Sequence, residues 1–219
     1  RVSRAVDDKP QGTINITNVD PNAGTFDVHV TNISSPKPIK KVALPTWSSV
    51  NGQDDIIWYD AKRQVDGTYK ISVTARDHKY STGEYNIHLY YLLEDNQLVG
   101  VGGTKTTVTI GKPQGKIDIV NNNPDTGSFD VVVSGVSNPY GVKKVVVPVW
   151  SSVNGQDDLV WYEAQLQTNG NYTVTVKASH HKNSLGEYNI HLYYVQDNGQ
   201  LVGVGGTSTV VSKAQPKGT

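Results

Sequence analysis

The 219-residue sequence contains no cysteine, no methionine and only two phenylalanines. The absence of cysteine excludes disulfide bonds, thiolate metal sites and a cysteine nucleophile. Lysine plus arginine and aspartate plus glutamate each number 20, so the formal net charge at pH 7 is zero. A neutral chain exerts no long-range attraction on a polyanion, and we therefore expect no nucleic-acid partner. No apolar run reaches the roughly 18 residues of a membrane-spanning helix, so we expect no membrane span.

The second half of the sequence repeats the first half without a gap. Trp47 corresponds to Trp150 and Phe26 to Phe129, and every Trp and Phe belongs to such a pair. The two copies match most closely in three blocks, which are WSSVNGQDD (47–55), GEYNIHLYY (83–91) and QLVGVGGT (97–104). A domain of about 100 residues buries over roughly 60% of its unfolded surface, enough for its own core. The sequence therefore predicts two tandem copies of one domain.

Short Lys-Pro-Gln-Gly segments precede both copies, and a looser version follows the second copy. Proline and glycine favour extended connectors with few contacts to neighbouring domains. We therefore predict linkers at 1–10 and 111–114, repeats at 11–110 and 115–213, and a linker to a following module at 214–219. Because the chain starts with Arg rather than Met, we expect a piece of a longer protein.

Apolar residues alternate with polar ones within each copy, and this period of two is typical of β-strands. Turn signals such as Asn51-Gly52 and Asp66-Gly67 separate the alternating segments. The pattern predicts strands at 12–19, 25–33, 39–46, 55–62, 68–75, 84–93 and 97–108 of the first copy. With no helical period, it predicts an all-β fold of two tandem Ig-like β-sandwich domains. Tyr85, which begins the sixth strand just after a glycine, resembles the tyrosine corner of such sandwiches.

Aromatic side chains are the first candidates for ligand contacts. On the predicted strand at 84–93, His88 and Tyr90 lie on the face opposite the expected core. An exposed Trp or Tyr presents an apolar ring face on which a sugar can stack. Trp47 and Trp58 either make such contacts or fill the core, and Trp47 is preferred because it adjoins a polar segment. The face with His88 and Tyr90 could instead be solvated or contact another domain.

The polar segment at 48–55 is identical in the two copies, although loops usually diverge fastest. Asp54 and Asp55 could accept hydrogen bonds from sugar hydroxyls, pair with an amine or bind Ca²⁺. Alternatively, the segment is fixed because Asn51-Gly52 requires a specific turn geometry. The calcium-loop pattern of EF-hands and the histidine spacing of zinc sites are both absent, so we expect no metal and no cofactor.

The sequence thus predicts one ligand-binding surface in each copy, combining aromatic with acidic side chains. Its residues are Trp47, Asp54, Asp55, His88 and Tyr90 in the first copy and Trp150, Asp157, Asp158, His191 and Tyr193 in the second. Adjacent carboxylates on a strand point to opposite faces, and no G-x-S-x-G nucleophile motif occurs. We therefore expect a binding module without catalytic residues.

The motifs WSSVNGQDD, GEYNIHLYY and LVGVGGT, which recur at matching positions, resemble the Bsp-like repeat, named after a group B streptococcal secreted protein. The resemblance covers nearly all of each copy, and Pro38 against Gly141 is one departure between the copies. It implies a non-catalytic module of the kind that accompanies the catalytic domain of peptidoglycan hydrolases, including streptococcal autolysins.

That resemblance further implies an extracellular, wall-associated protein. The expected partner is a cell-wall polymer, either peptidoglycan or teichoic acid, and the expected state is a monomer that acts with further repeats and a catalytic domain. The alternative is an adhesive or spacer repeat, which binds a protein partner or holds other domains apart. An Ig-like fold serves all of these roles, so the fold alone does not decide between them.

Overall fold

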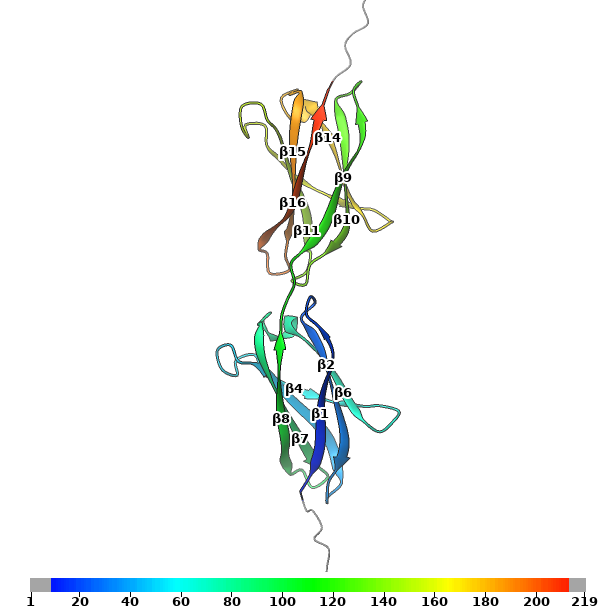
Figure 1. Cartoon of the computed structure of the whole chain (residues 1–219), viewed down its shortest axis with the longest axis vertical. Coiled ribbons are helices and arrows are strands. Elements are labelled where there is room, and N and C mark those ends of the chain that lie inside the picture. Colours follow the sequence, from blue (N-terminus) through cyan, green and yellow to red (C-terminus); the bar gives the residue numbers. More distant parts are fainter. Residues whose placement is uncertain (1–8, 213–219) are drawn as a thin grey trace, which may run out of the picture. The chain divides into compact units, whose positions relative to one another are not determined.

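The computed structural model describes residues 9–212, and the chain divides into two compact units between Gly111 and Lys112. Each unit is a sandwich of two four-stranded antiparallel sheets (Figure 1). The predicted all-β fold of two tandem Ig-like sandwiches is confirmed. Apart from Lys9 and Pro10, the linkers predicted at 1–10 and 214–219 lie outside the described residues. Within residues 9–212, no helix is long and apolar enough to cross a membrane.

The first unit contains eight strands and one turn of 3₁₀ helix. They are β1 (Gln11–Asp20), β2 (Thr25–Ser34), β3 (Ile39–Ser48), β4 (Ile57–Asp60), β5 (Lys62–Arg63), β6 (Tyr69–Thr74), η1 (Ala75–His78), β7 (Gly83–Leu93) and β8 (Leu98–Val108). The strand order is β1-β2-β6-β5 in one sheet and β4-β3-β7-β8 in the other.

The second unit repeats this arrangement element by element. It consists of β9 (Gln114–Asn123), β10 (Ser128–Ser137), β11 (Lys144–Ser151), β12 (Val160–Glu163), β13 (Gln165–Leu166), β14 (Tyr172–Lys177), η2 (Ala178–His180), β15 (Gly186–Val195) and β16 (Leu201–Val211). Its sheets have the orders β13-β14-β10-β9 and β12-β11-β15-β16, which match those of the first unit.

The single strand predicted at 55–62 is wrong. Residues 57–60 form β4 and pair with β3, whereas Lys62–Arg63 form β5 and pair with β6 in the opposite sheet. Between them the amide of Ala61 donates a hydrogen bond to the Val42 carbonyl, 2.9 Å away. The chain therefore crosses from one sheet to the other within this segment, and a period of two cannot reveal such a crossing.

The core lies between the two sheets, where alternate side chains of β2 and β7 meet. Phe26 of β2 packs edge-on against Tyr85 of β7, with ring centroids 5.9 Å apart. The Tyr85 hydroxyl donates a hydrogen bond of 2.8 Å to the Ser81 carbonyl, which confirms the predicted tyrosine corner. Because Tyr85 and its alternate neighbours point inward, the side chains between them must point outward from the sandwich.

Candidate functional site

Four aromatic rings gather on the outer face of the sheet β4-β3-β7-β8. The rings of Trp47 on β3 and His88 on β7 have centroids 4.7 Å apart and stand nearly perpendicular, at 75°. Those of Trp58 on β4 and Tyr90 on β7 are 5.3 Å apart and tilted by 50°. Trp58 is 51% exposed, whereas the other three are half-buried. We call this set, with its counterparts in the second repeat, the aromatic face.

The second repeat reproduces this geometry. Trp150 and His191 have ring centroids 4.7 Å apart, and Trp161 lies 5.5 Å from Tyr193. Trp161 is 52% exposed. A shallow hollow of about 220 Å³ opens on this face, lined by Pro148, Trp150, Gln156, Leu159, Trp161, His191 and Tyr193. The two repeats therefore present the same aromatic surface to solvent.

Glycines on the edge strand β8 make room for these rings. Gly103 pairs with His88 and Gly100 with Tyr90, and an irregularity in the pairing between Leu89 and Tyr90 leaves Val101 without a partner. A Cβ atom added at Gly103 would lie 2.8 Å from His88 Cδ2, which is closer than real Cβ contacts allow. The space that a β8 side chain would fill is thus taken by the imidazole ring.

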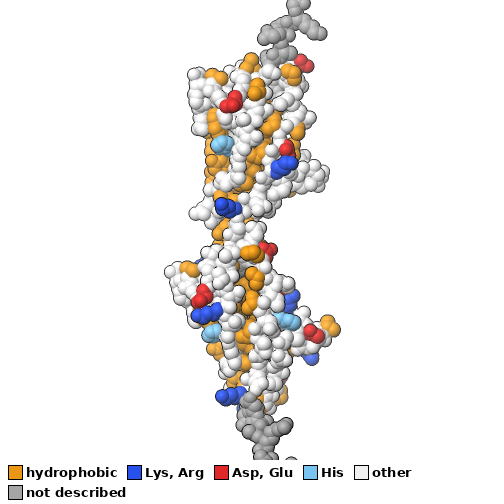
Figure 2. Space-filling view, viewed as in Figure 1, with side chains coloured by type: hydrophobic (Ala, Val, Ile, Leu, Met, Phe, Trp, Pro, Cys, Tyr) orange, Lys and Arg blue, Asp and Glu red, His pale blue; other side chains and the backbone are white. Residues whose placement is uncertain are grey.

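The aromatic face carries little charge. None of the seven residues that line the hollow in the second repeat is Asp, Glu, Lys or Arg. On the side of the molecule that Figure 2 shows, charged side chains of both signs are scattered, without a concentration of one sign. Such a surface suits a ligand that is itself uncharged, since buried charges would otherwise need partners.

The predicted acidic contacts are placed differently from the rings. The Asp54 carboxylate lies 3.2 Å from the Lys79 ammonium, and Asp157 makes the same 3.2 Å pair with Lys182. All four side chains are more than a third exposed, so these ion pairs contribute little to stability. Asp157 is not among the residues that line the hollow. Asp54 and Asp157 are thus engaged by lysines, and Asp157 lies outside the hollow.

Asp55 is buried and holds the loop in place. Its carboxylate accepts a hydrogen bond of 2.8 Å from the Ser48 amide and a second from the Ser48 hydroxyl. Its carbonyl oxygen lies 2.9 Å from His78 Nδ1, and His78 Nε2 lies 2.7 Å from the Tyr59 hydroxyl. Equivalent contacts join Ser151, Asp158, Tyr162 and His181. Because both carboxylates are engaged inside the fold, Asp55 and Asp158 are not presented to a ligand.

The protonation of this buried network is set by its surroundings. Burial lowers the pKa of His181, so the imidazole is held neutral, with one nitrogen free to donate and the other to accept. Burial alone would raise the pKa of Asp158, but hydrogen bonds from Ser151 and Ser184, together with the neighbouring His181, hold that pKa below its usual value. A neutral histidine beside an ionised carboxylate therefore stabilises the loop.

The fixed sequence of the loop has a structural cause in its turn. Asn51 and Gly52 adopt φ angles of 54° and 71°, the left-handed conformation that favours Asn and Gly. The loop also contributes to the aromatic face, because Gln156 and the adjoining Leu159 line the hollow in the second repeat. The sequence pattern did not identify Gln156 and Leu159 as site residues, favoured Trp47 over Trp58, and gave no role to the glycines of β8. The available signal for these residues was that each is identical or similar in the two copies.

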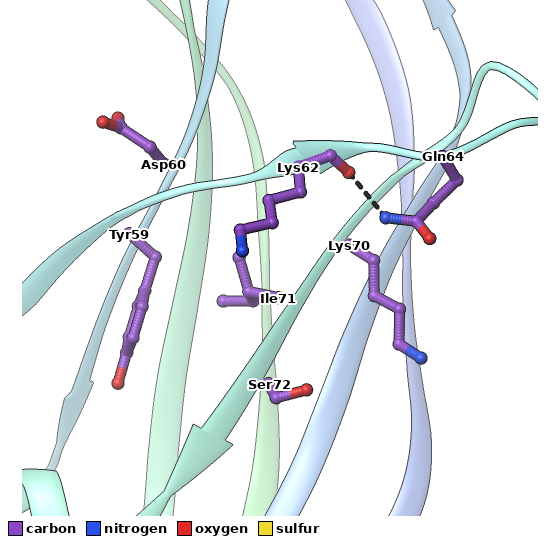
Figure 3. A pocket seen from close by; sticks show the side chains of 7 residues that line it. All are labelled: Tyr59, Asp60, Lys62, Gln64, Lys70, Ile71 and Ser72. Carbon is purple, nitrogen blue, oxygen red and sulfur yellow. Dashed lines mark hydrogen bonds between the residues drawn. The ribbon is translucent and has the colours of Figure 1, made fainter.

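The outer face of the opposite sheet differs in part between the copies, although the hydrogen bonds of Asp27 with Asn18 and Ser72 recur at Asp130 with Asn121 and Thr175. His29, Lys62 and Lys70 correspond to Val132, Gln165 and Thr173. A cavity of about 410 Å³ lies at the edge of this sheet in the first repeat (Figure 3). The four aromatic residues of the aromatic face are identical in the two copies, whereas these three positions are not. Among residues 9–212, no group of three or more His, Asp or Glu side chains is placed to bind a metal.

Solved structures of low sequence identity match the chain with TM-scores below 0.5. A polysaccharide deacetylase from Bacillus cereus matches with 19% identity and a TM-score of 0.38, over 48% of this chain and 31% of its own. The FN1–FN3 domains of chicken CNTN1 match with 13% identity and a TM-score of 0.35, over 94% of this chain and 66% of theirs. The chain thus spans about a third of the length of that deacetylase. These likenesses concern the fold alone.

No curated protein matches the sequence. The GBS Bsp-like repeat family, in contrast, matches it twice, over residues 15–106 and 118–209. The two matches fall on the two sandwiches and include every residue of both aromatic faces. The chain therefore belongs to the GBS Bsp-like repeat family and carries two tandem copies of its repeat.

Proposed function

We propose that each repeat binds a bacterial cell-wall polymer, without catalysis, through its aromatic face. One observation carries this proposal: an exposed Trp packs against a half-exposed Tyr with the same geometry in both repeats. The solvent-exposed part of each tryptophan offers apolar area to a ligand, worth about 25 cal/mol per Å² when covered. A retained surface of this kind is typical of a binding site.

The ligand that fits this face best is the glycan strand of peptidoglycan. A pyranose ring has an apolar side that can lie on Trp58 or Tyr90, and hydroxyls that can bond to the indole N–H and the phenol. The hollow of about 220 Å³ beside Trp161 has a neutral lining, which favours uncharged sugar units over phosphates. Teichoic acid, with its phosphate charges, is the less suitable wall polymer.

Two copies of a weak site can give useful affinity. Once one repeat is bound, the other meets the polymer at an effective concentration of about millimolar, which raises overall avidity by roughly 10²–10⁴. This would let a non-catalytic chain hold an attached wall hydrolase on its substrate outside the cell. The attachment to a hydrolase and the extracellular location are parts of the proposal.

Sedimentation with purified cell walls tests this function. The chain is mixed with intact walls and with walls stripped of teichoic acid, and the bound fraction is measured after centrifugation. We expect equal binding to both preparations. Binding that is lost on stripping would redirect the proposal to teichoic acid, and no binding to either would remove it.

The alternative functions, a spacer or a protein-binding adhesive, differ in whether they require exposed aromatic residues. A pure spacer requires no exposed aromatic residues, and full burial of Trp47, Trp58, His88 and Tyr90 would have favoured it. Trp58 and Trp161 are instead about half exposed, at 51% and 52%. This exposure supports a binding role over a pure spacer.

A further inference from the structure

The first repeat places two lysines opposite each other on neighbouring strands. Lys62 of β5 is the direct partner of Lys70 of β6, and Lys70 in turn pairs with His29 of β2. Like charges directly opposite each other on antiparallel strands destabilise the pairing. The Asp27 carboxylate, 3.3 Å from the Lys70 ammonium, offsets only part of this repulsion.

The fold does not require this arrangement. In the second repeat Gln165 pairs with Thr173, and both are uncharged, yet the strand order is the same. The sandwich thus forms equally with a neutral pair at this position. Lys70 is paired with Asp27, so the cation that remains open to an anionic ligand is Lys62.

A cavity of about 410 Å³ lies beside the two lysines. It is lined by Tyr59, Asp60, Lys62, Gln64, Lys70, Ile71 and Ser72. In Figure 3 the Lys62 side chain extends toward Ile71, whereas the Asp60 carboxylate points away from the other labelled residues. Asp60 lies 3.7 Å from the Lys41 ammonium, while Lys62 forms no ion pair within residues 9–212. The cavity therefore combines an apolar floor with an unpaired cation.

The polar groups of the cavity match the end of a peptide. Gln64 donates from Nε2 to the Lys62 carbonyl at 2.9 Å, which fixes the amide and leaves Oε1 as an acceptor. Gln64 and Lys62 line the same cavity, so an acylated amino acid bound there can offer its N–H to the Gln64 acceptor and its carboxylate to the Lys62 cation. Ile71 and the ring of Tyr59 can then contact a small apolar side chain. A phosphate would use the cation but not this apolar floor.

We infer that the cavity between Lys62, Lys70 and Ile71 of the first repeat binds a short peptide end: a small apolar residue with a free carboxylate. Lys62 pairs with the carboxylate, and Gln64 accepts a hydrogen bond from the peptide N–H. The site is separate from the aromatic face and does not depend on the function proposed for that face. It gives the first repeat a specificity that the second repeat lacks.

An NMR titration of the two-repeat chain tests this site, with the second repeat as an internal control. The probe is N-acetyl-alanyl-alanine at millimolar concentrations. We expect backbone amide shifts at residues 57–72 and none at the corresponding residues 160–175. The C-terminal amide of the same probe should shift neither set, because it lacks the charge that Lys62 binds.

Substitutions taken from the second repeat make the matched variants. The double substitution Lys62→Gln and Lys70→Thr installs residues that this fold already accepts, and we expect binding at least about tenfold weaker. The reverse change, Gln165→Lys with Thr173→Lys, should create the same shifts in the second repeat. Unchanged binding by the first variant would overturn the inference. So would absent shifts, or equal shifts with inorganic phosphate at residues 57–72.

Discussion

Trp58 and Tyr90 pack together although the strands that carry them are not neighbours. β3 lies between β4 and β7, so the indole reaches across a whole strand to place its ring 5.3 Å from the phenol. Pro45, the β3 partner of Trp58, is buried although it lies on the outer side of the sheet. The two rings therefore cover the outer side of β3 and form a continuous apolar surface. The residue pattern of one strand does not reveal this contact, because the rings come from two strands.

Replacing the exposed tryptophans should weaken wall binding and leave the fold intact. We expect the double variant Trp58→Ala with Trp161→Ala to bind purified walls at least about tenfold less, because each repeat loses its largest exposed apolar area. Sedimentation with walls measures the effect. The control is Val65→Ala, which changes an exposed apolar residue between β5 and β6 of the opposite sheet. Equal binding by the tryptophan variant and the parent would exclude the aromatic face as the site.

Glycines on the edge strands β8 and β16 allow a substitution that moves a ring of the aromatic face without removing it. A Cβ at Gly103 or Gly206 would lie 2.8 Å or 3.0 Å from Cδ2 of the paired histidine and would displace its ring. We therefore expect Gly103→Ala with Gly206→Ala to reduce wall binding. The matched control is Gly102→Ala with Gly205→Ala, where an added Cβ meets nothing within 4 Å. Similar losses in both variants would show that the histidine position does not matter.

The sequence contained most of the fold but only part of the site. Alternation placed Tyr85 inside and His88 outside because a strand buries every second residue. It could not separate Asp54 from Asp55, because their roles depend on Lys79 and His78, which are distant in sequence and meet the loop only after folding. The alternation of side chains depends only on neighbours in the sequence, whereas hydrogen-bond partners across the sandwich depend on the folded chain.

The buried carboxylates should matter for stability rather than for ligand binding. Asp55→Asn with Asp158→Asn replaces an oxygen that accepts from a serine by an N–H₂ group, and should cost about 1–3 kcal/mol of unfolding free energy in each repeat. The adjacent change, Asp54→Asn with Asp157→Asn, removes only exposed ion pairs and should cost at most about 1 kcal/mol. Denaturant unfolding of the chain measures both. Equal costs would show that burial of the second carboxylate has no consequence.

The buried histidine of the second repeat should make that repeat less stable in mild acid. Burial lowers the pKa of His181 in the folded state below its ordinary value of 6.5. The unfolded chain then binds the proton first as the pH falls. The resulting stability is fully present above pH 6.5 and is lost as the pH falls through the folded pKa. Asp158, whose pKa is lowered from 3.8, adds a second loss only at more acidic pH.

Denaturant unfolding at pH 7.5 and pH 5 separates this effect from general acid sensitivity. The variant His181→Gln keeps a side chain that can bond to the Asp158 carbonyl or the Tyr162 hydroxyl but does not titrate. We expect it to be less stable than the parent at pH 7.5, because one of the two hydrogen bonds of His181 is lost. The difference in unfolding free energy between parent and variant should shrink at pH 5. Only the parent is destabilised there, because its histidine binds a proton more readily in the unfolded chain than in the folded one. A difference of the same size at both pH values would show that His181 does not control the pH dependence of the second repeat.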